Sequence, residues 1–138
     1  MYDLEKIGKI TADLDRYFAD LDKLKVESPP MSKQGFYSLS MILFAILNRA
    51  IDLGQEIVRG RALGMPTSYK EIFQLLEKEK IISKQISLDL QYLAARRNVL
   101  AHEYFDVTEQ SIFAIYLKIK VVQEFRKNIT LFLSGKKK

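Results

Sequence analysis

Apolar residues recur at steps of three and four positions along almost the whole chain, and this spacing constrains the fold more than any other feature. The first segment has the apolar positions Leu4, Ile7, Ile10, Leu14, Phe18, Leu21 and Leu24. A period near 3.6 residues puts such side chains on one face of an α-helix, whereas a half-buried strand alternates with a period of two. No stretch of useful length alternates in that way. The sequence therefore predicts an all-α protein.

Breaks in this spacing divide the chain into helices with short connections. Pro29-Pro30 ends the first helix, because proline lacks a backbone N–H and disfavours helix at the residue before it. The later helices are predicted to begin at residues with N-capping side chains, which are Ser32, Ser68, Ser83 and Thr108. The length of 138 residues suits one domain. We expect a single antiparallel bundle of four or five helices over residues 1–135, followed by a lysine tail at 136–138.

The middle of the second predicted helix is apolar on every side, over residues Met41–Leu47. A helix with that pattern is either central to a bundle or buried by a second chain. Asn48, Arg49 and Asp52 follow directly, so polar groups lie next to the apolar stretch. Arg49 and Asp52 are three positions apart, which is the spacing of neighbours on one helix face, and they are placed to pair.

Composition excludes several classes of site. The chain has no cysteine and one histidine, which excludes disulfides, thiol chemistry, thiolate metal sites and a histidine-rich metal site within one chain. No cofactor is expected. The longest unbroken apolar run has seven residues, whereas about 20 are needed to cross a bilayer. We therefore expect a cytoplasmic protein without a membrane partner.

The net charge of +5 is unevenly distributed, because the last thirty residues contain seven basic and two acidic side chains. A positive region attracts polyanions such as nucleic acid. Three of these charges belong to the lysine tail Lys136–Lys138, however, and a solvated tail is the simpler explanation for them.

One segment combines residue types that can carry out chemistry. The only histidine, His102, lies five residues after Arg97 and two before Tyr104. Arg97 ends an apolar stripe that begins at Ile86, so it is expected to face the core or an interface, where an arginine needs a partner or a function. Five residues of continuous helix turn by about 500°, which leaves Arg97 and His102 about 140° apart. They converge only if the helix stops near Ala101, or if the two groups come from two chains across a symmetry axis.

These side chains suit the cleavage of RNA without a metal ion. The imidazole of His102 exchanges protons near neutral pH, and the guanidinium of Arg97 binds phosphate oxygens. A base for a ribose 2′-hydroxyl and a cation for the charge that builds on the phosphate are sufficient for this reaction. Asn98 would orient the phosphate or hold the arginine. The other six tyrosines, Tyr69 among them, have core-like spacings and are predicted to pack.

The same residues also allow a purely structural interpretation. Arg97 would then pair with Asp106 or Asp52 and tie helices together. His102 and Tyr104 would be half-buried packing residues, with the tyrosine hydroxyl bonded to Asp106. Composition and spacing alone leave both interpretations open.

At these residues the sequence resembles the HepT-like branch of the HEPN superfamily, the toxin half of toxin–antitoxin pairs. The family's signature is Arg, four residues, His, one residue, Tyr, and it is intact here from Arg97 to Tyr104. Leu47–Ile57 resembles the family's second helix. Gly64–Phe73 resembles its Pro-x-x-Tyr segment and the short helix that follows.

The resemblance implies more than the spacing does. It implies an antiparallel bundle that forms a homodimer, with the motifs of both subunits lining one cleft. The activity would be that of a metal-independent endoribonuclease toxin of a type VII pair, with Arg97 and His102 catalytic and Asn98 supporting them. The partner would be a small nucleotidyltransferase antitoxin that adenylylates Tyr104, so that the added phosphate blocks RNA. The alternative is a non-catalytic nucleotide-binding or adaptor subunit that partners such a nucleotidyltransferase.

Overall fold

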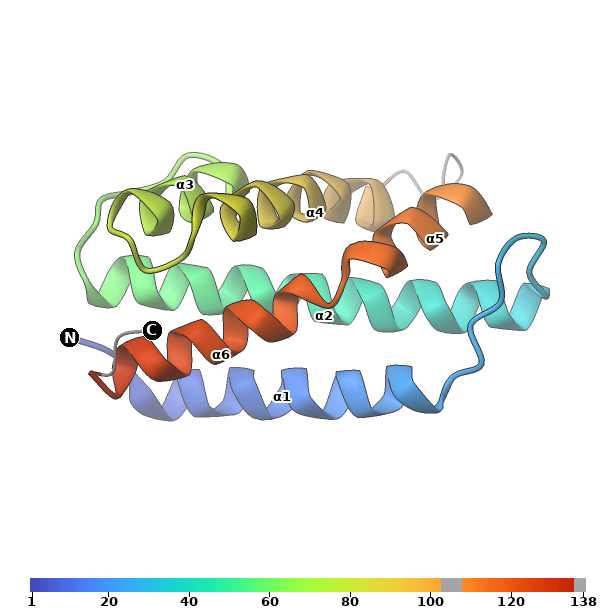
Figure 1. Cartoon of the computed structure of the whole chain (residues 1–138), viewed down its shortest axis with the longest axis horizontal. Helices are drawn as coiled ribbons and strands as arrows, with labels where there is room; N and C mark the ends of the chain where they lie inside the picture. The colour runs from blue at the N-terminus through green and yellow to red at the C-terminus, as the bar shows by residue number, and fades with distance from the viewer. Residues whose placement is uncertain (103–107, 136–138) are drawn as a thin grey trace.

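The computed structural model describes residues 1–102 and 108–135, except for the side chains of residues 98, 99, 101 and 102 (Figure 1). The described part contains six helices and no strand, so the predicted all-α fold is confirmed. The helices are α1 (Leu4–Lys23), α2 (Lys33–Gly60), α3 (Tyr69–Lys78), α4 (Lys84–His102), α5 (Glu109–Lys118) and α6 (Val121–Leu133). The expected lysine tail lies outside the described residues.

The helix starts follow the capping residues that the sequence indicates. The side chains of Ser32, Ser68 and Thr108 accept hydrogen bonds from backbone N–H groups in the first turns of α2, α3 and α5. Ser83 does the same before α4, where its hydroxyl accepts from the N–H of Ile86 at 3.2 Å. Each such cap stabilises its helix by about 1 kcal/mol, because it pairs an N–H that has no partner within the helix. All four predicted caps are confirmed.

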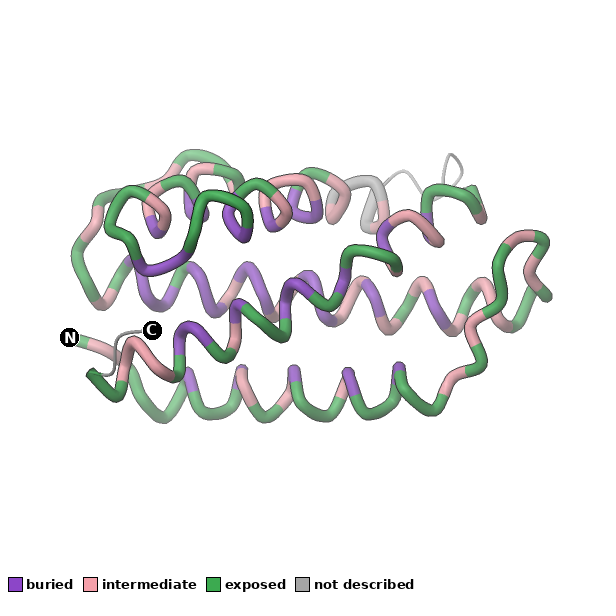
Figure 2. Tube along the Cα trace, viewed as in Figure 1, coloured by how far each residue is buried: buried purple, intermediate pink, exposed green. Residues whose placement is uncertain are grey.

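Helix α2 is the centre of the bundle. It packs against each of the other five helices, and it runs antiparallel to α1, which lies along one side of it (Figure 1). By length and composition alone, α2 is apolar enough to cross a membrane. In this fold its buried residues instead belong to the common core, and the buried positions lie on the inner sides of the helices that Figure 2 colours. The apolar middle of α2 is therefore explained in part by its central position.

The last predicted helix is divided in two. Helix α5 ends at Lys118 and α6 begins at Val121, because the hydrogen bonds at this point change from four-residue to three-residue spacing. The N–H of Val122 donates to the carbonyl of Ile119 at 3.0 Å. The resulting bend keeps the apolar stripe on both sides of it buried against the core. The antiparallel bundle is as expected, with this one additional break.

The contact between α2 and α3 depends on a glycine. A Cβ atom at Gly54 would lie 2.7 Å from the Cγ2 atom of Ile72 and 3.3 Å from the ring of Phe73. The missing side chain therefore lets α3 lie directly on α2. Phe73 continues the core by an edge-to-face contact with Phe125 of α6, with ring centroids 5.6 Å apart. This packing fixes the position of the first residue of α3, Tyr69.

Candidate active site near the end of helix α4

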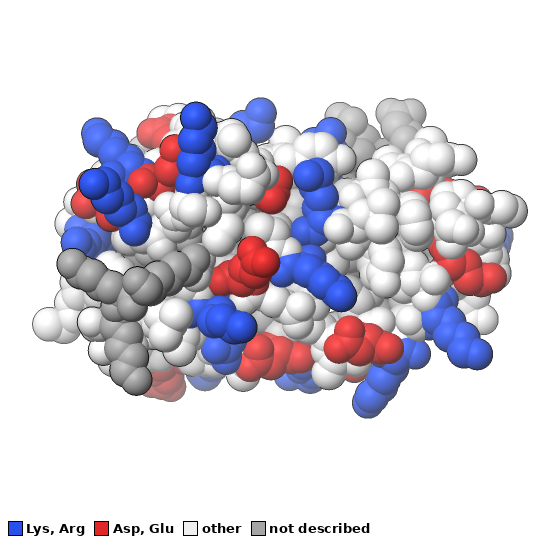
Figure 3. All heavy atoms as spheres, viewed as in Figure 1, with Lys and Arg blue, Asp and Glu red and all other residues white. Residues whose placement is uncertain are grey.

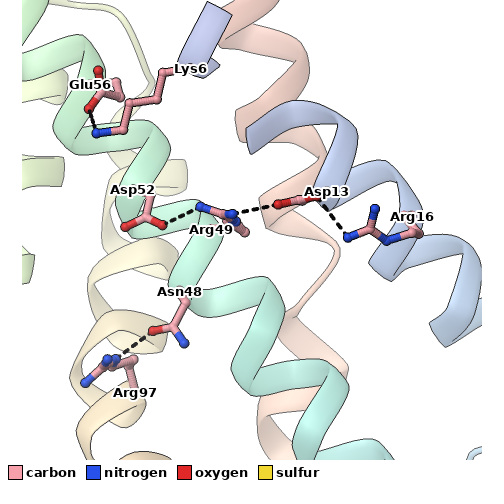
Figure 4. Close-up of polar contacts among 8 residues, drawn as sticks. All are labelled: Lys6, Asp13, Arg16, Asn48, Arg49, Asp52, Glu56 and Arg97. Carbon is pink, nitrogen blue, oxygen red and sulfur yellow. Dashed lines mark hydrogen bonds and ion pairs between the residues drawn. The ribbon is translucent and has the colours of Figure 1, made fainter. Parts of the chain in front are cut away.

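Arg97 lies where three helices meet. Its Nε donates a hydrogen bond of 2.7 Å to Oδ1 of Asn48 on α2 (Figure 4). Its guanidinium carbon is 5.4 Å from the ring centroid of Phe44 on α2 and 5.7 Å from that of Tyr69 on α3. Arg97 is half-buried, so the predicted orientation toward core or interface is confirmed. Two aromatic rings and one amide hold the guanidinium in a defined orientation.

Asn48 lies outside the motif, as do the two aromatic residues, and it is the one that bonds the guanidinium of Arg97. It lies one helical turn after Phe44, so both side chains leave α2 on the same face. The sequence signal was a polar residue directly after an apolar stretch. Its partner Arg97 is 49 positions away, and nothing in the local pattern identifies such a contact.

Arg49, next to Asn48, connects a different pair of helices. Its guanidinium bonds Asp13 of α1 at 2.7 Å and Asp52 of α2 at 3.0 Å, and the second contact confirms the expected pairing (Figure 4). Asp13 also pairs with Arg16 at 2.9 Å. Burial by itself lowers the pKa of Arg49, but the hydrogen bonds to the two carboxylates outweigh it and raise the pKa. Arg49 is thus a charged tie between α1 and α2.

The remaining residues of the motif lie partly or wholly outside the described residues. Helix α4 includes Asn98 and ends at His102, but the side chains of both are outside the described set. Tyr104 lies in the segment 103–107, which is also outside it, as does Asp106. Because α4 is continuous from Arg97 to His102, the two backbone positions differ by about 140° around the helix axis.

An apolar stripe leads along α2 to this site. Tyr37 and Met41 are 53% and 73% exposed, and Phe44 is half-buried on the same face. With Asn48 these residues follow one another at steps of four, three and four positions, which keeps them on one side of the helix. An exposed apolar stripe of this kind is typical of a surface that contacts another molecule.

Charges of both signs are mixed on the face that Figure 3 displays. Lys and Arg side chains alternate there with Asp and Glu and form no single basic patch (Figure 3). Among the described side chains, no three His, Asp or Glu groups gather in a way that could hold a metal ion.

Comparison with known proteins gives a family match and several relatives. Residues 7–129 match the family described as ribonuclease HepT-like. The putative RNase YutE of Bacillus subtilis is 24% identical over 132 residues, which cover 95% of this chain and 90% of YutE. The mRNA nuclease HepT of Shewanella oneidensis is 33% identical over 54 residues. That alignment covers 39% of this chain and only 41% of the Shewanella protein.

Solved structures share the fold over nearly the whole chain. The structure of YutE, described as a cytosolic protein, superposes with a TM-score of 0.86 at 25% identity and covers 98% of this chain and 94% of YutE. The tri-AMPylated HEPN toxin of Shewanella oneidensis, in complex with its MNT antitoxin, gives a TM-score of 0.81 at 20% identity. That match covers 94% of this chain and 98% of the toxin chain. At 20% identity the likeness shows a common fold.

Proposed function

This chain belongs to the HepT-like ribonuclease family, and on that basis we propose that it is a metal-independent endoribonuclease that acts as the toxin of a type VII toxin–antitoxin pair. The observation that carries the proposal is the fixed guanidinium of Arg97 within an intact Arg-x4-His-x-Tyr signature. Arg97 is half-buried between α2, α3 and α4 and is oriented by Asn48. A fixed planar guanidinium is well suited to binding two oxygens of one phosphate.

In the proposed reaction, the imidazole of His102 takes the proton of a ribose 2′-hydroxyl, and the 2′-oxygen attacks the adjacent phosphorus. The bond from phosphorus to the 5′-oxygen breaks, and that oxygen receives a proton from an imidazolium. The products are a 2′,3′-cyclic phosphate and a 5′-hydroxyl. Arg97 stabilises the negative charge that develops on the phosphate oxygens, and Asn98 supports the position of the phosphate.

We propose that the active form is a homodimer. Two features support a homodimer. The backbone positions of Arg97 and His102 differ by about 140° around the axis of one continuous helix. In addition, an apolar stripe with the exposed residues Tyr37 and Met41 ends at the site. Pairing two protomers along this stripe would cover the apolar side chains and bring both motifs to one cleft. Arg97 of one protomer would then work with the His102 imidazole of the other.

The proposed regulation is covalent. A nucleotidyltransferase antitoxin would transfer AMP from ATP to the hydroxyl of Tyr104 and release pyrophosphate. Two observations support this regulation. Tyr104 lies two residues after His102, and the similar toxin of Shewanella oneidensis is described as tri-AMPylated and in complex with an MNT antitoxin. Each added phosphate brings negative charge close to Arg97 and competes with RNA. We also propose a cytoplasmic location, in line with the cytosolic relative YutE.

The test is RNA cleavage by the purified protein in the presence of EDTA. We expect cleavage with 2′,3′-cyclic phosphate ends, and we expect Arg97→Ala and His102→Ala to abolish it. The matched control is Arg96→Ala, because Arg96 is the neighbouring arginine of α4 but stacks on Tyr92, with its guanidinium carbon 3.5 Å from the ring centroid. Circular dichroism of each variant verifies the fold.

Intact RNA after incubation with the unaltered protein would contradict the proposal and favour the non-catalytic adaptor. Cleavage that survives both substitutions would contradict the assigned residues. For Tyr104, intact mass after incubation with the partner and ATP should increase by AMP units, and the increase should disappear in Tyr104→Phe.

A further inference from the structure

A hollow of about 350 Å³ lies beside Tyr69, one of the two aromatic residues that contact Arg97. It is lined by Gln55 of α2, by the segment Pro66–Tyr69 that leads into α3, and by Ile72. Tyr69 belongs both to this hollow and to the surroundings of Arg97, whose guanidinium carbon is 5.7 Å from the tyrosine ring. The volume lies within the range of about 300–1,000 Å³ that is typical of small-molecule sites. The hollow and the proposed phosphate site therefore share a wall.

Hydrogen bonds tie the segment before α3 to the first turn of that helix. The backbone N–H and the hydroxyl of Thr67 both donate to Oε2 of Glu71, at 3.0 and 2.7 Å. The hydroxyl of Ser68 accepts from the N–H of Glu71 at 3.2 Å. The bonds from the Thr67 N–H and hydroxyl lower the pKa of Glu71 and keep its carboxylate ionised and occupied. The absence of a side chain at Gly54 lets α3 lie directly on α2, so that Gln55 of α2 and Tyr69 of α3 line the same hollow.

The chemistry of the lining differs from that of Arg97. Each of the lining residues named above is uncharged, so the hollow suits a neutral group, while the adjacent guanidinium suits a phosphate. Tyr69 provides an aromatic face, and Gln55 provides an exposed amide with one acceptor and two donor hydrogens. The Gln55 amide has no hydrogen-bond partner among the described residues. A nucleotide has the same two parts, an uncharged base and a negatively charged phosphate.

We infer that the hollow binds one nucleobase of the RNA next to the scissile phosphate, and that Gln55 makes the site select adenine. This inference rests on the proposed function. Single-stranded bases are recognised by stacking on aromatic side chains and by hydrogen bonds to their edges. Tyr69 provides the stacking, although its spacing predicts a packing role. We assign the contact to the Hoogsteen edge of the base, where a glutamine amide pairs in a bidentate manner with N6 and N7 of adenine and no other base offers the same donor and acceptor.

The experiment measures RNA binding separately from cleavage. The His102→Ala protein is titrated against fluorescent hexamers of adenylate and of uridylate, and anisotropy gives both affinities. We expect adenylate to bind about tenfold more tightly, as one bidentate base contact allows. Gln55→Ala in this background should abolish the difference. The control is Gln74→Ala, because Gln74 is an exposed glutamine of α3 that bonds Gln91 outside the hollow.

Cleavage mapping supplies the second measurement. Sequencing of the 5′ ends produced from a random RNA pool should show adenine enriched at one position beside the cut. The enrichment should be lost in Gln55→Ala, retained in Gln74→Ala, and retained in Tyr69→Phe, which keeps the ring. Equal affinity for the two hexamers, or a preference unchanged by Gln55→Ala, would overturn the inference. A protein that binds adenylate selectively but never cleaves RNA would contradict only the proposed function.

Discussion

Asn48 and Arg49 are adjacent on α2, yet their side chains leave the helix about 100° apart and meet different helices. Asn48 faces α4 and bonds Nε of Arg97 at 2.7 Å. Arg49 faces α1 and bonds Asp13. The first contact orients the proposed phosphate-binding group, whereas the second holds two helices together. We therefore propose that Asn48 is a positioning residue that acts through Arg97.

Replacing Asn48 should reduce catalysis more than stability. Asn48→Ala removes the hydrogen bond that orients the guanidinium of Arg97. We expect kcat/KM for a fluorogenic RNA to fall about 10- to 100-fold, because a small displacement of a group that positions the substrate lowers the rate by up to about 100-fold. Asn48→Asp should raise KM further, because a carboxylate beside Arg97 competes with the phosphate. Thermal unfolding serves as the control. A value of kcat/KM in Asn48→Ala equal to that of the unaltered protein would refute the positioning role.

The Arg-x4-His-x-Tyr motif is visible in the sequence, whereas the residues that surround Arg97 in space are not. Arg97 ends an apolar stripe, so its inward orientation followed from helical spacing alone. Its contacts with Asn48, Phe44 and Tyr69 depend on how α2, α3 and α4 are packed, and sequence spacing within one helix contains no information about that packing.

The helices themselves are encoded locally, but their contacts depend on a few special positions. The four predicted capping residues all occupy the N-termini at which they were expected. The break between α5 and α6 was not predicted, because the apolar spacing continues through Ile119 and Val122 without interruption. Tertiary packing decides this break, since bending brings both halves of the stripe onto the core.

Gly54 provides a test at the level of helix packing. Gly54→Ala puts a Cβ atom 2.7 Å from Ile72, so α3 must move away from α2. We expect the free energy of unfolding to fall by about 1–3 kcal/mol, as overpacking usually costs. RNA cleavage should fall as well, because Tyr69 moves with α3.

The matched control is Gly8→Ala on α1, where a Cβ atom meets nothing within 4 Å. That change should stabilise the protein by about 0.5–1 kcal/mol, because alanine favours helix over glycine. Urea denaturation measures both variants. Equal stability of Gly54→Ala and the unaltered protein would contradict the close contact of α2 and α3.

The chain folds as an all-α bundle, and we propose that its site is completed by a second protomer. Composition excluded disulfides and thiolate metal sites, and helical spacing predicted the bundle and its central helix. The spacing of Arg97 and His102 also indicated that one continuous helix keeps them apart. How a second protomer pairs with the first stays a prediction, because it depends on surfaces that meet only between chains.

Disrupting the apolar stripe should therefore give a monomer. Met41→Glu adds a charge in the middle of the stripe, where Met41 is 73% exposed. We expect analytical ultracentrifugation at micromolar concentration to show a dimer for the unaltered protein and a monomer for this variant, with loss of RNA cleavage. Met65→Glu is the control, since Met65 is 91% exposed in the connection after α2. A dimeric Met41→Glu protein would exclude this stripe as the interface.

The most direct test of the account is complementation between two inactive protomers. Arg97→Ala and His102→Ala chains with different tags are co-expressed, and the heterodimer is isolated by successive affinity steps. If Arg97 of one protomer works with His102 of the other, one of the two symmetric sites is intact. The heterodimer should then have about half the RNA-cleaving activity of the unaltered dimer, since one site of two remains. If the unaltered dimer cleaves RNA but the heterodimer is as inactive as the Arg97→Ala and His102→Ala homodimers, a site shared between two protomers would be contradicted.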